Sequence, residues 1–347
     1  MKKRYTIRDI AQRAGVSVAT VSNVINGIQK VSEETKQVVL ETMAVLDYQP
    51  NLVARSLSKN RSDMIGLLLP ITDEGGDASL LLRDNPFYGE FISGVESMAT
   101  KMGYDVLIRG IRPGESCRDW IVKRNLDAAI FVGNYTAVIS GEMRELNSRL
   151  VLVDAYDEGV KQHPSVGIDD RHGGYLATKH LLDLGHRSIA FAASNIMVDG
   201  AIYRRFQGYK SAMAEYGITQ LNHLIKQDTL NFEGGYRMGR WLLEQTGKIS
   251  AVFASADTVA FGIMKALFEK GVQIPEQLSI VGFDDTKGCE YSNPALTSIR
   301  QPIYQKGMTA AETVIMAIER PPAKMSKIQF PVELIQRNST QKYFVRK

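Results

Sequence analysis

The fold of the N-terminal part of this chain is decided by residues 6–26, which read TIRDIAQRAGVSVATVSNVIN. Apolar residues recur at helical spacing over residues 7–14, and Gly15 then ends the helix because glycine tolerates a positive φ. Ser17 is a candidate N-cap for a second helix over residues 18–25, which Asn26-Gly27 would end. The segment therefore predicts two short helices joined by a glycine-containing turn.

A third helix is predicted to follow Ser32, whose hydroxyl can cap it, and to reach Leu46 before Tyr48-Gln49-Pro50. Two short helices joined by such a turn, with a third covering their apolar face, form a helix-turn-helix unit. A purely structural three-helix bundle would show the same spacing. The pattern favours DNA binding but leaves the structural alternative open.

Charge is distributed unevenly between the two ends of the chain. Residues 1–62 hold ten Lys or Arg against five Asp or Glu, a net charge of +5. The remaining residues hold 32 basic and 33 acidic side chains, a net charge of −1. A basic N-terminal unit on a near-neutral body is the distribution expected of a nucleic-acid-binding headpiece.

Length and composition bound the class of protein. The 347 residues predict two or three domains, and 44% hydrophobic with 23% charged residues is typical of a soluble globular chain. No window approaches the roughly 18 consecutive apolar residues of a membrane-spanning helix.

The basic start is followed by polar residues where a signal peptide needs an apolar core, so we expect a cytoplasmic protein. Cys117 and Cys289 are expected to be reduced, packed thiols.

Motifs of the common enzyme classes are absent from the sequence. No G-x-G-x-x-G follows a predicted strand, and no G-x-x-x-x-G-K-[ST] or G-x-S-x-G occurs. The five histidines show no H-E-x-x-H or other metal-ligand spacing, and no pair of carboxylates stands out as acid and base. We therefore expect a protein that is not an enzyme and uses no cofactor and no metal.

Several ordered motifs together resemble the lactose and purine repressor family. They are residues 6–11, 14–17, 19–22, 24–26 and 50–57, and further along 185–186, 205–208 and 281–285. The resemblance implies an all-α helix-turn-helix headpiece at 1–50, a hinge helix or linker at 51–62, and an effector-binding and dimerisation body at 63–347. The body would be a two-lobed α/β unit similar to periplasmic binding proteins, with parallel sheets flanked by helices.

The resemblance implies a set of DNA contacts in the headpiece. A recognition helix presents its first side chains to base edges in the major groove, so Val18, Ala19 and Asn23 would face bases. The phosphate contacts would be Ser17, Thr20, Ser22 and Asn26, and the set also includes Thr6 and Ile7. The amide of Asn23 pairs naturally with adenine. Alternatively, Val18 and Ala19 are surface positions with little part in specificity.

Residues 51–62 look like a polar, basic linker, but the resemblance implies a hinge helix that is ordered on DNA. This helix would pair with that of a dimer partner and insert Leu57 between base pairs from the minor groove, which kinks the DNA. Its other contacts in the predicted set are Asn51, Ala54 and Arg55. The alternative is that Leu57 packs on the headpiece core.

Beyond Asp63, short apolar runs alternate with amphipathic helices, which predicts parallel sheets covered by helices. The candidate strands are residues 65–69, 105–108, 128–132, 150–153, 165–168, 189–192, 251–254 and 280–283. By resemblance the chain crosses between two lobes three times, and we place the crossings near 160–165, 289–297 and 320–327. The N lobe would hold about 63–162 and 296–321, and the C lobe about 163–290 and 325–340.

Ligands gather at the carboxyl ends of parallel strands, where Asp154 and Asp284 follow two of the predicted strands. Each acid alone is an ordinary loop residue. By resemblance they form, with Arg205, the polar contacts of a hydroxyl-rich effector, and Phe87-Tyr88 supply the apolar wall. Asp169-Asp170 are interpreted as a helix cap rather than as ligand contacts.

Three departures from the family pattern concern the effector. Ala256 stands where sugar-binding members often carry Asn, which removes one hydroxyl contact. Leu230 stands where an aromatic ring often stacks on the ligand, and we expect Phe232 to substitute. Residues 72–84 lengthen the loop after the first strand, as in some maltose-type regulators, which points to an oligosaccharide.

The sequence therefore predicts a dimeric, ligand-responsive repressor of a carbohydrate-utilisation operon. Its partners would be double-stranded operator DNA, a sugar or sugar-derived effector and a second copy of the chain, with no membrane. A corepressor-dependent regulator, a regulator that depends on a partner protein, and a sugar-binding protein without DNA binding remain alternatives.

Overall fold

The computed structural model describes residues 5–25, 28, 30–48, 61–71, 82–112, 114–133, 139, 141–143, 146, 149–156, 163–197, 200–245, 247–319 and 326–343. The chain forms two compact units, Met1–Asp63 and Met64–Lys347, which are described separately below. The predicted contacts Asn26, Asn51, Ala54, Arg55 and Leu57 lie outside the described residues, as does most of the loop at 72–84.

The smaller unit contains the three helices that the sequence predicts: α1 (Ile7–Ala14), α2 (Val18–Ile25) and α3 (Glu33–Val45). Thr6 caps α1 in a capping box with Asp9, and Gly15 follows α1 at a φ of 66°. A small apolar core joins the helices and consists of Ile10, Ala11, Val21, Val39 and Leu46.

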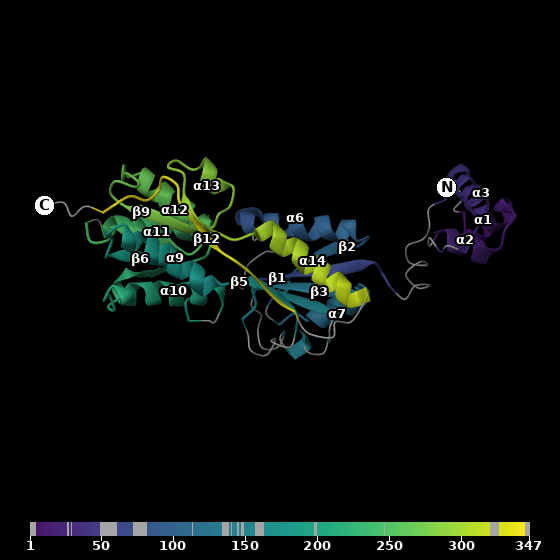
Figure 1. The fold of residues 1–347 in the computed structure, drawn as a ribbon, viewed down its shortest axis with the longest axis horizontal. Helices are drawn as coiled ribbons and strands as arrows, with labels where there is room; N and C mark the ends of the chain where they lie inside the picture. The colour runs from purple at the N-terminus through teal and green to yellow at the C-terminus, as the bar shows by residue number, and fades with distance from the viewer. Residues whose placement is uncertain are drawn as a thin grey trace. The chain divides into compact units, whose positions relative to one another are not determined.

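The larger unit contains two six-stranded sheets, which define its two lobes (Figure 1). The N-lobe sheet has the order β11-β5-β4-β3-β1-β2 and comprises β1 (Met64–Pro70), β2 (Asp105–Ile111), β3 (Ala128–Val132), β4 (Leu150–Val153), β5 (Ser165–Ile168) and β11 (Lys327–Phe330). The C-lobe sheet has the order β12-β10-β9-β8-β6-β7 and comprises β6 (Ile189–Ala193), β7 (Ile225–Gln227), β8 (Ala251–Ala254), β9 (Ser279–Asp284), β10 (Thr297–Arg300) and β12 (Glu333–Ile335). Among the described strands every pair is parallel except β10 with β12, as the predicted α/β body requires.

Helices cover the sheets. Those of the N lobe are α6 (Pro86–Lys101), α7 (Cys117–Lys123) and α14 (Ile303–Glu319), and those of the C lobe are α9 (Asp170–Asp183), α10 (Ala201–Glu215), α11 (Phe232–Glu244), α12 (Asp257–Phe268) and α13 (Gly288–Tyr291). In β1, Ile65 and Leu67 pack in the same cluster as α6 and α14, whereas Leu68 packs with Trp120 of α7. The central strands are thus buried on both faces, which explains their continuous apolar runs.

The chain crosses between the lobes three times, but each crossing comes later than predicted. The first lies between β5 and α9, because residues 165–168 pair with β4 and β11 in the N lobe. The second lies at Gln301-Pro302, after β10 has paired with β9, and the third at Pro331-Val332, between β11 and β12. The predicted crossings at 160–165, 289–297 and 320–327 are therefore wrong. So are the lobe limits that followed from them: 165–168 and 327–330 belong to the N-lobe sheet, and 297–300 belongs to the C-lobe sheet.

Two glycines let α9 and α10 pack closely. A Cβ at Gly174 would overlap the Arg205 carbonyl, and a Cβ at Gly208 would overlap the Arg171 carbonyl. Because the helices approach this closely, Asp170 at the start of α9 lies beside Arg205 on α10. The close packing thus positions one half of the cavity described below.

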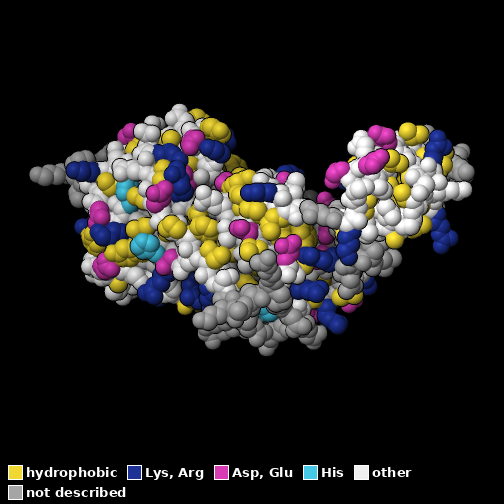
Figure 2. Space-filling view, turned by 45° about the vertical axis from the view of Figure 1, so that its right-hand side comes forward, with side chains coloured by type: hydrophobic (Ala, Val, Ile, Leu, Met, Phe, Trp, Pro, Cys, Tyr) yellow, Lys and Arg dark blue, Asp and Glu magenta, His cyan; other side chains and the backbone are white. Residues whose placement is uncertain are grey.

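The surface of the larger unit carries charges of both signs. On the face in Figure 2, Lys and Arg side chains lie among Asp and Glu side chains rather than in one field. This mixture agrees with the near-neutral charge counted from the sequence. None of the helices in the described part of the chain is long and apolar enough to cross a membrane.

Candidate functional site

A cavity of about 280 Å³ lies between the lobes of the larger unit, at the carboxyl ends of β1, β3 and β4. The C lobe contributes the first turns of α10 and the residue that ends β9. The cavity is lined by Pro70, Asn85, Phe87, Tyr88, Val132, Gly133, Asp154, Asn195, Gly200, Ala201, Ile202, Arg205, Leu230, Ala256, Asp284 and Gln301. Five of the six predicted effector contacts are in this set.

Phe232 is the exception. It is the first residue of α11, its side chain is 38% exposed, and it does not line the cavity. The expectation that Phe232 supplies an aromatic wall is therefore wrong, because the helix begins after Asn231 and directs residue 232 elsewhere. The aliphatic Leu230 occupies the wall instead, and Phe87 and Tyr88 are the aromatic residues that line this space.

On the N-lobe side, Asp154 is paired with a lysine that the sequence reasoning missed. Lys306 of α14 is fully buried, and its Nζ lies 2.5 Å from Asp154 Oδ2, 2.7 Å from Gln301 Oε1 and 5.1 Å from the centroid of the Phe87 ring. A buried ammonium needs such partners, because desolvation penalises an unpaired charge. One feature of the sequence could have indicated this buried lysine, since Lys306 interrupts the apolar face that α14 forms with Ile303 and Ala310.

On the C-lobe side, Arg205 is buried and makes several contacts at once. Its Nε donates to Asp170 Oδ1 at 2.7 Å and one terminal nitrogen donates to the Ser255 carbonyl at 2.6 Å. The same nitrogen lies 3.7 Å from Asp284 Oδ1, and the guanidinium stacks 3.5 Å from the centroid of the Phe283 ring. Arg205 is thus held rigidly by charge and packing, as a binding group should be.

Two side chains, Gln301 and Tyr156, connect these halves across the lobes. Gln301, at the second crossing, donates from Nε2 to Asp284 Oδ1 at 2.6 Å while its Oε1 accepts from Lys306. Tyr156, which follows β4 of the N lobe, donates its hydroxyl to Asp170 Oδ2 at the start of α9. A continuous polar network therefore runs between the lobes around the cavity, and a ligand that competes for any of these groups changes the link between the lobes.

The predicted role of Asp169-Asp170 is correct for one residue and wrong for the other. Asp169 Oδ1 accepts from the His172 backbone N–H at 2.9 Å and so caps α9. Asp170 is not a cap, because its carboxylate is buried against Arg205 and Tyr156. No sequence spacing indicated this pair, which depends on the close packing of α9 on α10.

Burial changes the ionisation of the acids and of the tyrosine at the cavity. Desolvation, together with the charge of Asp257, raises the pKa of Asp284 to about 7, although Arg205 acts in the opposite direction. Desolvation, with Asp154 and Asp284 nearby, raises the pKa of Tyr88 to about 12, so its hydroxyl remains a donor. Near neutral pH the cavity therefore offers both donors and acceptors.

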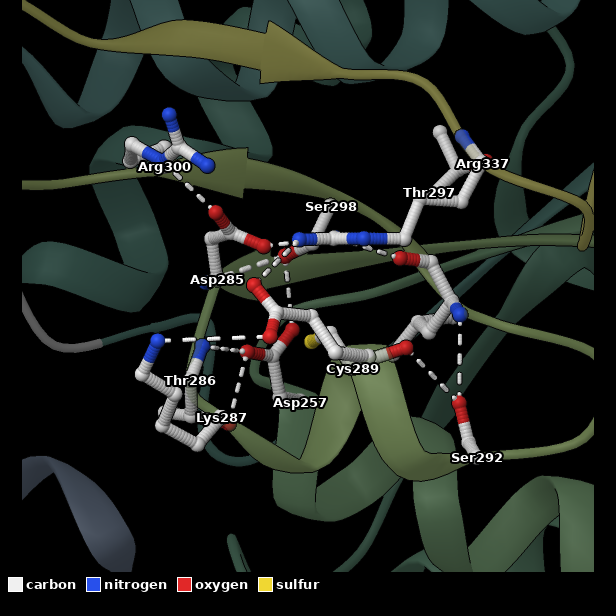
Figure 3. A network of polar contacts seen from close by, with 12 residues as sticks. Asp257, Asp285, Thr286, Lys287, Cys289, Ser292, Thr297, Ser298, Arg300 and Arg337 are labelled. Atoms are coloured by element: carbon white, nitrogen blue, oxygen red, sulfur yellow. Dashed lines mark hydrogen bonds and ion pairs between the residues drawn. The ribbon is translucent and has the colours of Figure 1, made fainter.

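Asp257 holds the loop after β9 and does not line the cavity. Its Oδ2 accepts from the Thr286 backbone N–H at 2.8 Å, and its Oδ1 accepts from the Ser298 hydroxyl at 2.7 Å (Figure 3). Asp285 in the same loop pairs with Arg300 at 2.7 Å and Arg337 at 2.6 Å. These contacts fix the loop that follows Asp284, whose backbone has a φ of 112°. Ala256, which precedes Asp257, does line the cavity, and its side chain is apolar.

In the headpiece, the predicted base contacts lie on α2, and two of them are its first residues. Val18 is 42% exposed, Ala19 is exposed, and Asn23 is partly buried one turn later. Ser17 Oγ accepts from the Thr20 backbone N–H at 3.0 Å and bonds the Thr20 hydroxyl at 2.8 Å, so it caps α2 as predicted. Thr6 similarly caps α1, Ser22 is partly buried on α2, and Ile7 packs beside the headpiece core.

The two cysteines are free and buried, as expected. Cys117 donates to Glu142 Oε2 at 3.0 Å, and burial raises the pKa of its thiol. Across the ranges that the structure describes, His, Cys, Asp and Glu nowhere gather in a group of three that could hold a metal ion.

The headpiece and the lobed body with its polar cavity define a helix-turn-helix protein with a periplasmic-binding-protein-like body. Two family models match accordingly: "Bacterial regulatory proteins, lacI family" over residues 6–51 and "Periplasmic binding protein-like domain" over residues 178–340. The chain is 34% identical to the ribose operon repressor of Haemophilus influenzae, over 91% of this chain and 92% of the relative. It is 31% identical to the catabolite control protein A of Priestia megaterium, over 96% and 99%. The chain belongs to the lacI family of bacterial regulatory proteins, which confirms the resemblance that the motifs indicated.

Two solved structures of regulators with bound sugars are similar to this chain. The complex of the transcriptional regulator CelR with cellobiose has a TM-score of 0.72 and 26% identity, covering 97% of this chain and 100% of its own. A lacI-family regulator of Enterococcus faecium with bound ribose has a TM-score of 0.71 and 29% identity, covering 81% and 100%. The predicted architecture of headpiece and two-lobed α/β body is thus confirmed.

Proposed function

We propose that this protein is a cytoplasmic repressor of a carbohydrate-utilisation operon, released from a palindromic operator when a sugar or sugar-derived effector binds between the lobes. The observation that carries the proposal is the polar network around the interlobe cavity. Asp154, Arg205 and Asp284 present charged groups from both lobes, and Phe87 and Tyr88 supply an apolar wall. Hydroxyl-rich ligands match such a mixture of donors, acceptors and aromatic rings.

The network also explains how effector binding between the lobes can change the affinity for DNA. Gln301 and Tyr156 hold the lobes together through hydrogen bonds to Asp284 and Asp170. An effector that takes over these hydrogen bonds favours a different lobe arrangement, which alters the N lobes that carry the headpieces. A second copy of the chain supplies the second headpiece, so the symmetry of a homodimer is matched by the palindrome.

DNA contact is proposed for the residues singled out in the sequence, with Val18, Ala19 and Asn23 facing bases. The exposure of Val18 and Ala19 at the start of α2 supports this assignment. Corepressor-dependent and partner-dependent regulation are the competing proposals, and relatives named PurR and catabolite control protein A give them support. In both of these mechanisms the bound corepressor or partner protein raises the affinity for DNA, whereas an inducer lowers it.

The experiment that tests DNA recognition is selection of fragments of the source genome by the purified protein at moderate, fixed salt, because phosphate contacts make affinity salt-dependent. We expect enrichment of one short palindrome with a flexible step at its centre. Repeating the selection with sugars and with purines added separates induction from corepression. Failure to enrich any sequence under all three conditions would contradict both induction by a sugar and corepression by a purine, and would leave regulation through a partner protein as the remaining proposal.

A further inference from the structure

A second cavity, of about 270 Å³, lies beside the central one in the N lobe and extends along β5 and β11 from their first residues, Ser165 and Lys327. The central cavity borders β1, β3 and β4, whereas the second borders β4, β5 and β11, and Asp154 lines both. The C lobe contributes to both cavities through consecutive residues of α10, since Arg205 lines the central cavity and Arg204 lines the second. Asp154 thus stands at the boundary between two adjacent hollows.

The two carboxylate oxygens of Asp154 have different environments. Oδ2 is held by Lys306, next to the central cavity. Oδ1 lies toward Gly167, where a Cβ would be 3.3 Å from it, and Gly167 lines the second cavity but not the first. This oxygen is buried without a hydrogen-bond partner among the described residues. A buried acceptor without a donor is costly, so Oδ1 is a group that a ligand hydroxyl would satisfy.

His163 supplies a second group of the same kind. Its side chain lines the second cavity, the residue is 4% exposed, and Nε2 has no hydrogen-bond partner within the described ranges. Burial lowers the pKa of His163, so the ring is neutral near pH 7 and Nε2 donates or accepts according to its tautomer.

These two groups decide what chemistry the second cavity accepts. A hydroxyl donates a hydrogen bond to Asp154 Oδ1 and pairs with either tautomer of His163. A phosphate or carboxylate would instead place an acceptor against the Asp154 carboxylate. The cavity therefore fits a neutral, hydroxyl-bearing group better than an anion, although Arg204 and Lys327 also line it.

We propose that the second cavity binds the second sugar residue of a neutral oligosaccharide effector whose first residue occupies the central cavity. Asp154 Oδ1 and His163 Nε2 bind its hydroxyl groups. This inference rests on the proposed function, because it requires a sugar between the lobes.

The test compares sugars of different length on the full-length protein by isothermal titration calorimetry. The probes are glucose, galactose and ribose against maltose, cellobiose and lactose. We expect at least one disaccharide to bind ten-fold or more tightly than its monosaccharides. Gly167→Ala should remove most of that advantage and leave monosaccharide affinity within two-fold, because the new methyl group lies against Asp154 Oδ1. Gly141→Ala, whose Cβ would meet no atom within 4 Å, is the matched control.

His163→Leu provides a second variant in case Gly167→Ala fails to fold, and it should also lower the disaccharide advantage, by five-fold or more. Equal affinity for disaccharides and monosaccharides, or an advantage unchanged in both variants, would overturn the second sugar site while leaving a sugar-responsive regulator intact. Absence of binding by all six sugars would instead contradict the proposed function, and the second site with it.

Discussion

Arg205→Ala is expected to abolish the response of operator binding to effector and to lower the free energy of unfolding of the body by about 3–5 kcal/mol. The variant removes the cation that Asp170 and Asp284 share inside the molecule. Asp170 is 1% exposed, so its carboxylate would remain buried and would keep the Tyr156 hydroxyl as a hydrogen-bond partner without any cation beside it among the described residues. Removing one partner of a buried ion pair costs more than the pair itself contributes, because the remaining charge stays desolvated.

The measurements are urea unfolding of the variant and titration of its operator complex with the inducing sugar. Arg240→Ala is the matched control, because Arg240 is exposed on α11 and should change neither property. If Arg205→Ala does not fold, Arg205→Lys retains the charge but loses the forked contacts, and it should still lose most effector affinity. If either variant still releases DNA normally when the sugar is added, Arg205 is not part of the effector site.

Asn23→Ala is expected to weaken binding to the selected operator by about 1–3 kcal/mol, roughly 5- to 150-fold, with little change in binding to random DNA. A side-chain amide makes two hydrogen bonds to adenine in the major groove, and alanine makes none. Because no charge is removed, the salt dependence of binding should also be unchanged.

The control for Asn23→Ala is Gln37→Ala, which removes an exposed amide from α3 instead of α2. Fluorescence anisotropy with operator and with scrambled DNA gives the ratio of the two affinities. An unchanged ratio in Asn23→Ala would mean that Asn23 does not read a base and that specificity lies elsewhere in the headpiece.

The apolar patterns of the sequence were sufficient for most of the fold. All eight predicted strands are present, since each is a run of apolar residues. The four strands that were missed, β7, β10, β11 and β12, are three or four residues long and partly polar, as in Thr297–Arg300. Three of these four flank the second and third crossings, which is why those crossings were placed too early.

The site was predictable only where a residue follows a strand or belongs to a family motif. Asp154, Asp284 and Arg205 met these conditions, and all three line the cavity. Lys306 and Gln301 did not, because their role depends on how α14 and the second crossing pack against the ends of β4 and β9. Asp170 was misinterpreted because a neighbouring acid caps the same helix.

The central claim is that effector in the interlobe cavity and operator on the headpieces are coupled. The most direct test measures operator affinity with and without saturating sugar, and sugar affinity with and without operator, under identical salt. We predict that the sugar weakens operator binding and that operator weakens sugar binding by the same factor, about 5- to 150-fold, because coupling between two sites is reciprocal. Equal affinities in the presence and absence of the other ligand would contradict the account, and mutual tightening would identify a corepressor instead of an inducer.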